Sequence, residues 1–289
     1  MRTPTKLLTL ASAALLTTAV ASASPAVAMK KPARATWAPA DTAAIHPGVQ
    51  MYTDGAQCTG NFVFTDGSGA TYVGYAAHCA GLGEATDTDG CTSGSLPLGT
   101  KVDFVEGGSL VTSGTKVGSG TLAYSSWLTM QSKGETDENA CAYNDLALVK
   151  VDAADVAKVN PSVPFWGGPV GINTTGTAAG DTVYSFGNSS LRAGIEQLSP
   201  KQGTSLGTDP SGWTHPVYTV TPGVPGDSGS AFLDAEGNAL GTLSTLALAP
   251  LAGSNGVGDL AHELAYAQAH GPLDGLRLVP GTEPFSPLL

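Results

Sequence analysis

Short runs of apolar residues, each bounded by glycine, proline or other turn-forming residues, recur along most of this chain. Runs of three to six residues have the usual length of β-strands and are short for helices. The breaks between them, such as Asp66-Gly67-Ser68-Gly69, have the composition of hairpin turns. Strands and turns at this spacing predict a β-sandwich or β-barrels. The runs are Asn61–Phe64, Thr71–Ala76, Lys101–Val105, Leu146–Val151, Thr182–Phe186, Val217–Val220, Ala231–Leu233 and Ala239–Ser244.

The composition agrees with an all-β fold. The 289 residues include 38 Gly and 19 Pro, while only 13% are charged, which favours strands and turns over a helical bundle. One helix is expected near the end, because Asp259 is a good N-cap, Leu260 and Leu264 share a face, and Gly271 is a stop signal. The proline- and glycine-rich segment 160–169 predicts a connection between two β units.

The N-terminus has the three parts of a secretory signal peptide. Basic residues precede an uncharged stretch of 14 residues, from Leu7 to Val20, and Ala26-Val27-Ala28 matches the small-residue cleavage pattern. Because the stretch is too short to span a bilayer, a permanent membrane anchor is the less favoured alternative. Residues 1–28 are therefore predicted to be a signal peptide and residues 29–45 a flexible, propeptide-like leader. The mature protein is expected to be secreted and extracellular, with no membrane association.

The charge balance excludes one class of partner. The chain has 13 Lys and Arg against 24 Asp and Glu, and removal of residues 1–28 changes the net charge from −11 to −13. Proteins that bind nucleic acid need a basic surface, so no nucleic-acid partner is expected. The acidic stretches 84–89 and 135–138 are interpreted as solvated loops, because they lack the remaining ligand spacing of a calcium loop. The product is expected to be an acidic monomer.

The four cysteines are Cys58, Cys79, Cys91 and Cys141, all in the first half of the mature chain. In an exported protein they favour two structural disulfides, and three pairings are possible. No Cys-x-x-Cys spacing occurs, so neither a metal site nor a redox dithiol is expected.

Three short motifs contain residues suited to nucleophilic catalysis. Gly226-Asp227-Ser228-Gly229 places a serine on a tight turn, where backbone N–H groups can converge on an anion. His78, which follows a strand-like run and precedes Cys79, is the candidate base; a histidine that only ends a strand is the alternative. Asp145 precedes Leu146-Ala147-Leu148, where a buried carboxylate needs a hydrogen-bond partner such as an imidazole. A strand-edge solubility charge is the alternative there.

Together, Ala76-Ala77-His78-Cys79, Asn144-Asp145-Leu146-Ala147-Leu148 and Gly226-Asp227-Ser228-Gly229 resemble the motifs of chymotrypsin-like serine proteases, particularly the secreted actinobacterial ones. Their order, His then Asp then Ser, is that of chymotrypsin and differs from that of subtilisin and the α/β-hydrolases. The resemblance extends over roughly residues 46–275 and implies an all-β fold of two antiparallel six-stranded Greek-key barrels. The implied divisions are an N-terminal barrel over 46–158, a C-terminal barrel over 159–258, a helix over 259–271 and a tail over 272–289.

The resemblance also implies roles for individual residues. Ser228 is the expected nucleophile, His78 the general base and then acid, and Asp145 the group that holds the imidazole tautomer. The backbone N–H groups of Gly226 and Ser228 are expected to form the oxyanion hole. Ser244 is expected to support Asp145 and to line the substrate cleft.

The implied disulfide beside the histidine joins Cys58 to Cys79, which leaves Cys91 to pair with Cys141. The implied substrate is a polypeptide, hydrolysed through an acyl-enzyme without a cofactor or metal.

The chain departs from the family pattern in several places. Ser230 stands where most relatives have glycine, and Leu246 lies on the expected wall of the substrate cleft. The activation N-terminus of animal relatives is missing, so Asp227 needs an internal partner, for which Arg192 is a candidate. The expected pocket floor, near Pro222, has no acidic residue. A trypsin-like preference for Lys or Arg is therefore disfavoured, and a small or apolar side chain is expected in the pocket.

Two other functions stay open beside a serine endopeptidase. Ser230 and Leu246 are compatible with a catalytically silent relative that binds proteins. An esterase is the other alternative, because acyl transfer to a serine does not by itself imply cleavage of amides.

Overall fold

The computed structural model describes residues 36–83, 88–246 and 252–287, together with Met1. Contacts divide the chain into Met1–Pro32 and Ala33–Leu289, and every element below belongs to the second unit. Apart from Met1, the predicted signal peptide lies outside the described residues. None of the helices in the described part of the chain combines the length and the apolarity that crossing a bilayer requires.

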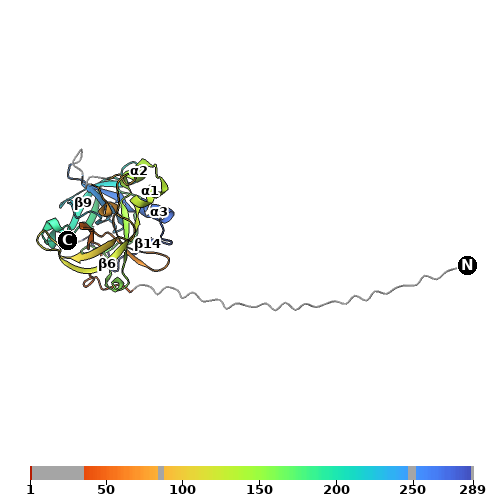
Figure 1. Ribbon diagram of the computed structural model, residues 1–289. Helices are drawn as coiled ribbons and strands as arrows, with labels where there is room; N and C mark the ends of the chain where they lie inside the picture. Colours follow the sequence, from red (N-terminus) through yellow and green to blue (C-terminus); the bar gives the residue numbers. More distant parts are fainter. Residues whose placement is uncertain (2–35, 84–87, 247–251, 288–289) are drawn as a thin grey trace. The chain divides into compact units, whose positions relative to one another are not determined.

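The first sheet contains eight antiparallel strands in the order β14-β3-β4-β7-β6-β5-β1-β2 (Figure 1). Its buried side chains form two clusters: one includes Phe104, Leu122 and Trp127, and the other, which includes Phe64 and Leu148, is shared with residues of the second sheet. The register of β4 against β7 pairs Ala76 with Leu146. The strands are β1 Gln50–Thr53, β2 Ala56–Thr59, β3 Val63–Thr65, β4 Thr71–Ala76, β5 Lys101–Glu106, β6 Thr115–Ser125, β7 Leu146–Val151 and β14 Arg277–Leu278.

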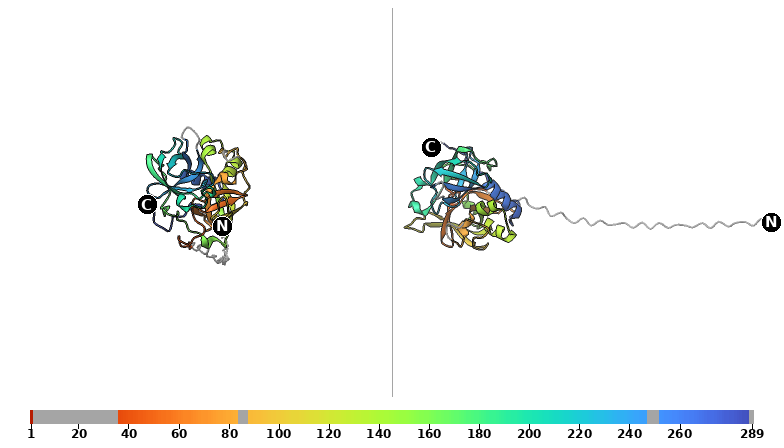
Figure 2. Two further views of the ribbon diagram at one scale, coloured as in Figure 1. Left: turned by 90° about the vertical axis from the view of Figure 1, so that its left-hand side faces the viewer. Right: turned by 90° about the horizontal axis from the view of Figure 1, so that it is seen from above.

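The second sheet is a closed antiparallel barrel in the order β10-β13-β12-β11-β8-β9 (Figures 1 and 2). A separate cluster of buried apolar residues, including Val183, Phe232 and Val257, fills it. The strands are β8 Ala179–Phe186, β9 Pro200–Leu206, β10 Thr214–Thr219, β11 Ala231–Leu233, β12 Ala239–Leu246 and β13 Asn255–Asp259. The predicted fold class, all-β with two strand units and a C-terminal helix, is confirmed.

The C-terminal tail and the leader both differ from their expected structure. Residues 272–289, expected as a tail, supply β14, because the buried Leu276 and Leu278 pack into a core of the first sheet. Residues 46–158 contain seven strands, β1 to β7, where six were expected, and β14 is the eighth strand of the first sheet. Ile45, expected in a flexible leader, is fully buried and forms a parallel bridge with Val159. In both segments, buried apolar side chains pack against residues that are far away in the sequence, and this packing gives the segments an ordered structure.

The helix α3, Leu260–His270, begins as predicted at Asp259, whose side chain accepts the His262 N–H, and ends at Gly271. It packs beside α1, Ser126–Lys133, which the sequence analysis missed (Figure 2). A third helix, α2 Glu138–Tyr143, was also missed. Residues that favour helix ends were present in the sequence: Ser125 and Gly134 cap α1, and Asp137 caps the start of α2. The short 3₁₀ segments are η1 Ala77–Ala80, η2 Val156–Lys158, η3 Ser190–Arg192 and η4 Glu196–Leu198.

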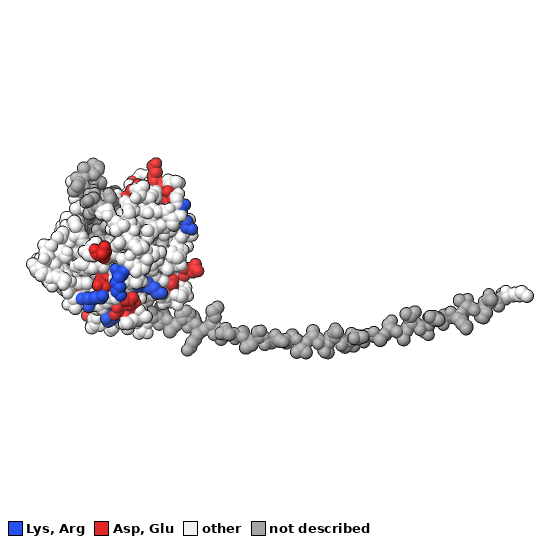
Figure 3. All heavy atoms as spheres, in the orientation of Figure 1, with Lys and Arg blue, Asp and Glu red and all other residues white. Residues whose placement is uncertain are grey.

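Surface charges of the first sheet are paired across strands and loops. In the face drawn in Figure 3, Lys and Arg side chains lie among Asp and Glu. The pairs are Lys101–Asp152, Lys116–Asp103 and Lys158–Asp155. Each joins partly exposed groups, so each contributes about 1 kcal/mol or less to stability.

Candidate active site

The pairing of β4 with β7 brings His78 and Asp145 to the same end of the first sheet. Ala76, the last residue of β4, lies opposite Leu146, the first residue of β7. The chain then enters η1, where the Ala77 N–H donates to the Asp145 carbonyl at 2.8 Å. The residue after one strand and the residue before the other are therefore neighbours, although 67 positions separate them.

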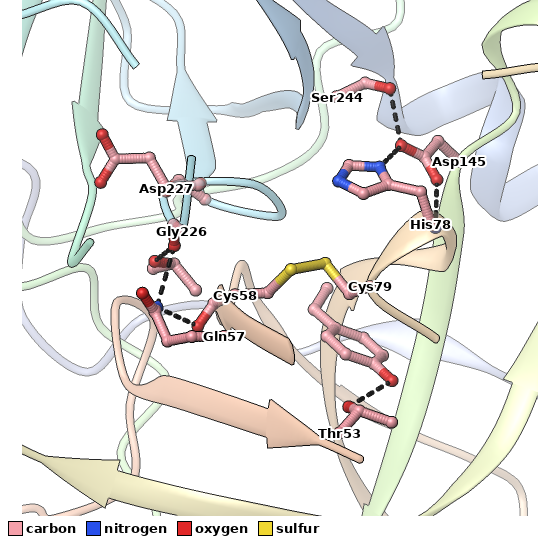
Figure 4. Close-up of a disulfide and its surroundings, with 12 residues drawn as sticks. Thr53, Gln57, Cys58, His78, Cys79, Asp145, Gly226, Asp227 and Ser244 are labelled. Carbon is pink, nitrogen blue, oxygen red and sulfur yellow. Dashed lines mark hydrogen bonds and ion pairs between the residues drawn. A yellow bond between two sulfur atoms is a disulfide. The ribbon is translucent and has the colours of Figure 1, made fainter. Parts of the chain in front are cut away.

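The Asp145 carboxylate accepts three hydrogen bonds (Figure 4). One oxygen, Oδ2, lies 2.6 Å from His78 Nδ1 and 2.6 Å from Ser244 Oγ, while Oδ1 accepts the His78 backbone N–H at 2.8 Å. Both carboxylate oxygens are thus satisfied although Asp145 is buried, which meets the condition for keeping an acid inside the protein. The contacts fix the imidazole with Nδ1 toward Asp145, and among the described residues Nε2 has no hydrogen-bond partner.

The charge of Asp145 also sets the proton affinity of His78. Burial by itself lowers the pKa of a histidine, because it disfavours the charged form. The negative charge of Asp145 and its hydrogen bond oppose burial, and together they raise the pKa of His78 above the ordinary value of 6.5.

Two disulfides hold the segments on which these residues lie. Cys79 in η1 is bonded to Cys58 in β2, with Cα atoms 6.1 Å apart, and Cys91 is bonded to Cys141, with Cα atoms 5.1 Å apart. This is the pairing that the resemblance implied. The sulfur atoms near His78 are therefore not thiolates, so they cannot act as metal ligands.

The backbone before Ser228 forms a tight turn, and the residues in it have the conformational preferences that this turn requires. The Asp227 N–H donates to the Val224 carbonyl at 2.9 Å, and Gly226 has a φ of +94°. Proline at the second position and a glycine with positive φ at the third are the pattern of a type II turn, which Pro225 and Gly226 supply here. Among the described residues, the backbone N–H groups of Gly226 and Ser228 have no acceptor.

Contacts from β2 hold the same turn. Gln57 Nε2 donates to the Gly226 carbonyl at 3.0 Å (Figure 4), and Thr59 Oγ1 donates to the same carbonyl at 2.7 Å. The Thr59 N–H donates to the Ser228 carbonyl at 2.8 Å. Gln57 also accepts the Ser190 N–H at 2.9 Å. The first sheet thus fixes the backbone on both sides of Asp227, a feature that sequence reasoning missed.

Asp227 is fully buried and is bound by two cations. Its Oδ2 lies 2.5 Å from Arg192 and 3.1 Å from Lys201 Nζ. Arg192 is the partner expected from the sequence, and Lys201 is an addition. Burial lowers the pKa of Lys201, and Arg192 lowers it further, while Asp227 opposes both. The backbone N–H groups of Ser189 and Val224 also donate to this carboxylate.

Lys201 left only a weak signal in the sequence. It is the single charged residue of β9, in a strand otherwise made of Pro, Gln, Gly, Thr, Ser and Leu. A lone lysine in such a strand usually points to solvent. Only the closure of the barrel turns it inward against Asp227.

A cleft of about 430 Å³ brings the expected residues together. His78, Ser228, Ser244 and Leu246 all line it, and so does the turn that contains Gly226. Pro222 is not among its lining residues. Its carbonyl instead accepts a hydrogen bond from Arg192 at 2.9 Å.

Asn255 in β13 closes one side of this cleft. Its side chain accepts the Gly223 N–H at 2.8 Å and donates to the Gly223 carbonyl at 3.3 Å and to the Thr245 carbonyl at 3.1 Å. The amide therefore ties together the backbone segments around Gly223 and Thr245, which both line the cleft. Sequence reasoning did not identify Asn255.

The acidic stretches have different outcomes. Most of 84–89 lies outside the described residues. In 135–138, Glu135 accepts the backbone N–H groups of Thr136 and Asp137 and the Tyr266 hydroxyl. Its carboxylate therefore organises a turn, and these hydrogen bonds lower the pKa of Glu135.

No protein-family model and no curated protein matches the chain. Solved structures do match. Thermobifida fusca protease A is 19% identical, with a TM-score of 0.47, over 82% of this chain and 99% of that one. Nocardiopsis protease is 18% identical, with a TM-score of 0.45, over 81% and 98%. Cellulomonas bogoriensis chymotrypsin has the same identity, TM-score and coverages as the Nocardiopsis enzyme.

Proposed function

We propose that the chain is a serine endopeptidase that hydrolyses peptide bonds with Ser228 as nucleophile, His78 as general base and Asp145 as the group that orients the imidazole. One observation supports this proposal most strongly. The Asp145 carboxylate is hydrogen-bonded to His78 and Ser244, and both of these residues line the cleft that Ser228 also lines. A base held by a carboxylate beside a serine on a glycine turn is the arrangement that acyl transfer to serine requires.

In the first half of the reaction, Ser228 Oγ attacks the substrate carbonyl carbon while His78 Nε2 takes the hydroxyl proton. The carbonyl oxygen becomes an oxyanion, which the N–H groups of Gly226 and Ser228 stabilise; one such donor is worth about 3 kcal/mol. The tetrahedral intermediate collapses as His78 returns the proton to the leaving amine. An acyl ester on Ser228 remains, and the carboxylate of Asp145 stabilises the transient imidazolium.

In the second half, water takes the place of the serine hydroxyl. His78 accepts a proton from the water, the resulting hydroxide attacks the ester carbonyl, and a second oxyanion forms in the same hole. Collapse breaks the bond to Ser228 Oγ, which regains its proton from His78. The carboxylic acid product leaves, and the site returns to its starting state.

The cleft supports a preference for a small or apolar side chain before the scissile bond. Within the described residues, no Asp, Glu, Lys or Arg side chain lines it. Asn255 bridges Gly223 to Thr245, and the exposed Leu246 stands at the rim. A short apolar substrate side chain needs no opposite charge in the cleft, and it fits into a shallow pocket.

Action outside the cell as a monomer is also part of the proposal. A signal-like N-terminus and two disulfides support export, because disulfides persist in oxidising compartments. The natural substrate would then be an extracellular polypeptide.

Treatment of the mature protein with a fluorophosphonate probe tests the nucleophile. The wild type is expected to be labelled, and Ser228→Ala to lose both labelling and about six orders of magnitude in kcat. Ser230→Ala serves as the control, because its Oγ bonds the Asp227 carbonyl behind the turn. Equal labelling of wild type and Ser228→Ala would sink the assignment, and absence of labelling in both would favour a binding protein.

If the wild type is labelled, digestion of a peptide library defines the reaction. Cleavage after small or apolar residues supports the proposed specificity. Hydrolysis of esters without any peptide cleavage would identify an esterase instead.

The acid limb of kcat/KM is expected to lie above pH 6.5. A protonated His78 cannot accept the serine proton, and its pKa is raised, so activity falls as the pH drops through that raised value. The same shift contributes stability that is present below the unfolded-state pKa and lost as the pH rises through the folded one. A pH profile, with NMR titration of His78, measures both. An inflection below pH 6 would contradict the electrostatic role of Asp145.

A further inference from the structure

Glu263 is a fully buried acid that the proposed reaction does not use. It lies in the first turn of α3, on the face that packs inward, with a relative exposure of 0%. The helix begins at Asp259, the last residue of β13, so Glu263 directly follows the last strand of the second sheet. Its carboxyl group nevertheless reaches the segment that holds Asp145 in the first sheet.

Both oxygens of the Glu263 carboxyl have defined partners. Oε1 accepts the Asp145 backbone N–H at 3.1 Å, and Oε2 lies 2.9 Å from the Thr242 hydroxyl, which can accept a hydrogen bond from a protonated Oε2. Thr242 Oγ1 in turn accepts a hydrogen bond from Asn61 at 3.2 Å. The approach depends on Gly258, where a Cβ would stand 2.5 Å from Oε1. The carboxyl thus joins β12, two residues before Ser244, to the Asp145 backbone.

The surroundings of Glu263 disfavour a negative charge. Among the described residues no Lys, Arg or His forms an ion pair with it. The titratable groups that face it are Asp145 before β7, Asp259 at the end of β13 and the Tyr124 phenol on β6. Burial, followed by the charge of Asp145, raises the pKa of Glu263 well above its usual range. Buried carboxyls near a second carboxylate stay protonated for this reason.

We propose that Glu263 is a positioning residue for Asp145 and that its carboxyl is uncharged while it acts. This rests on the proposed function. Glu263 fixes the Asp145 backbone, so the Asp145 carboxylate stays in line with His78 Nδ1. Because Glu263 is neutral, Asp145 remains the single charge that acts on the imidazole from this side.

Two variants separate position from charge. Glu263→Gln keeps an oxygen for the Asp145 N–H and an NH₂ group that can donate to Thr242. We expect kcat/KM within about threefold of the wild type and an unmoved acid limb. Glu263→Ala leaves the buried Asp145 N–H without an acceptor. Such a loss corresponds to about 10- to 100-fold, expected in kcat with KM changed less than threefold. Glu138→Gln, an exposed acid on α2, is the matched control.

The proposal is overturned if folded Glu263→Ala, checked by thermal melting, keeps full kcat. It is also overturned if Glu263→Gln moves the acid limb down by half a pH unit or more, because that shift would mean that a negative charge had been removed. If Glu263→Ala does not fold, the comparison rests on the Gln variant.

Two measurements do not depend on turnover, so they distinguish failure of this proposal from failure of the proposed function. NMR titration of His78 should give the same pKa in the wild type and in Glu263→Gln. The infrared difference between these proteins at neutral pH should contain the C=O band of a protonated carboxylic acid. A carboxylate band in its place overturns the proposal even if the protein has no peptidase activity.

Discussion

Asp145→Asn is expected to lower kcat by about four orders of magnitude, the size of effect known for this exchange in a Ser-His-Asp triad. An amide whose oxygen still accepts the His78 backbone N–H presents NH₂ to both His78 Nδ1 and Ser244 Oγ, because these two groups contact the same carboxylate oxygen of Asp145. The imidazole then adopts the tautomer with its proton on Nε2, where it cannot accept the proton of Ser228. Steady-state kinetics on a peptide substrate measure the loss, and KM should change little.

The same variant predicts a shift in the pH profile. The charge of Asp145 raises the pKa of His78, so its removal should move the residual acid limb to lower pH. Asp54→Asn, in an exposed turn, is the control with the same chemical change. An Asp145→Asn enzyme with nearly full kcat would remove His78 and Asp145 from the mechanism together.

Asp227→Ala is expected to destabilise the protein by about 3–5 kcal/mol, because it leaves buried cations without a counter-charge. Lys201 is fully buried, and Arg192 is 10% exposed. The carboxylate also anchors the N–H groups of Ser189 and Val224, so the Ser228 turn loses its support. Urea denaturation measures the stability, and probe labelling of the folded fraction measures the loss of reactivity.

A double variant shows whether the destabilisation comes from the charge. Lys201→Met replaces one buried cation by an apolar side chain of similar length. Because Arg192 remains as a partner of Asp227, the single variant should cost less than Asp227→Ala. Added to Asp227→Ala, Lys201→Met should restore part of the lost stability. Additive losses in the double variant would contradict the ion-pair account.

Local patterns were sufficient for much of the architecture. The short apolar runs predicted the strands, and Asp259 with Gly271 predicted α3, because strand length and helix caps depend on neighbours in the sequence. The helix α1 was missed although Ser125 and Gly134 cap it. The burial of Ile45 and the pairing of β14 had no local signal, because their apolar partners are far away in the chain.

The candidate site divides in the same way. His78, Asp145 and Ser228 could be predicted as catalytic candidates because each lies in a motif of neighbouring residues and their order is distinctive. Ser244 and the disulfide pairs followed from the resemblance, and the structure brings each to its expected partner. Pro222 was expected in the pocket by counting back from Ser228, and the structure turns its carbonyl toward Arg192 instead.

The sequence by itself determined the fold class, the three motifs and the acidic net charge of the chain. Only the tertiary structure decided which groups surround those motifs. Lys201 forms an ion pair with Asp227, Gln57 donates a hydrogen bond to the Gly226 carbonyl, and Glu263 accepts one from the Asp145 backbone. Each of these contacts joins residues far apart in the chain. Their approach is set by barrel closure and strand register, which result from many weak interactions at once and leave no pattern at the residues themselves.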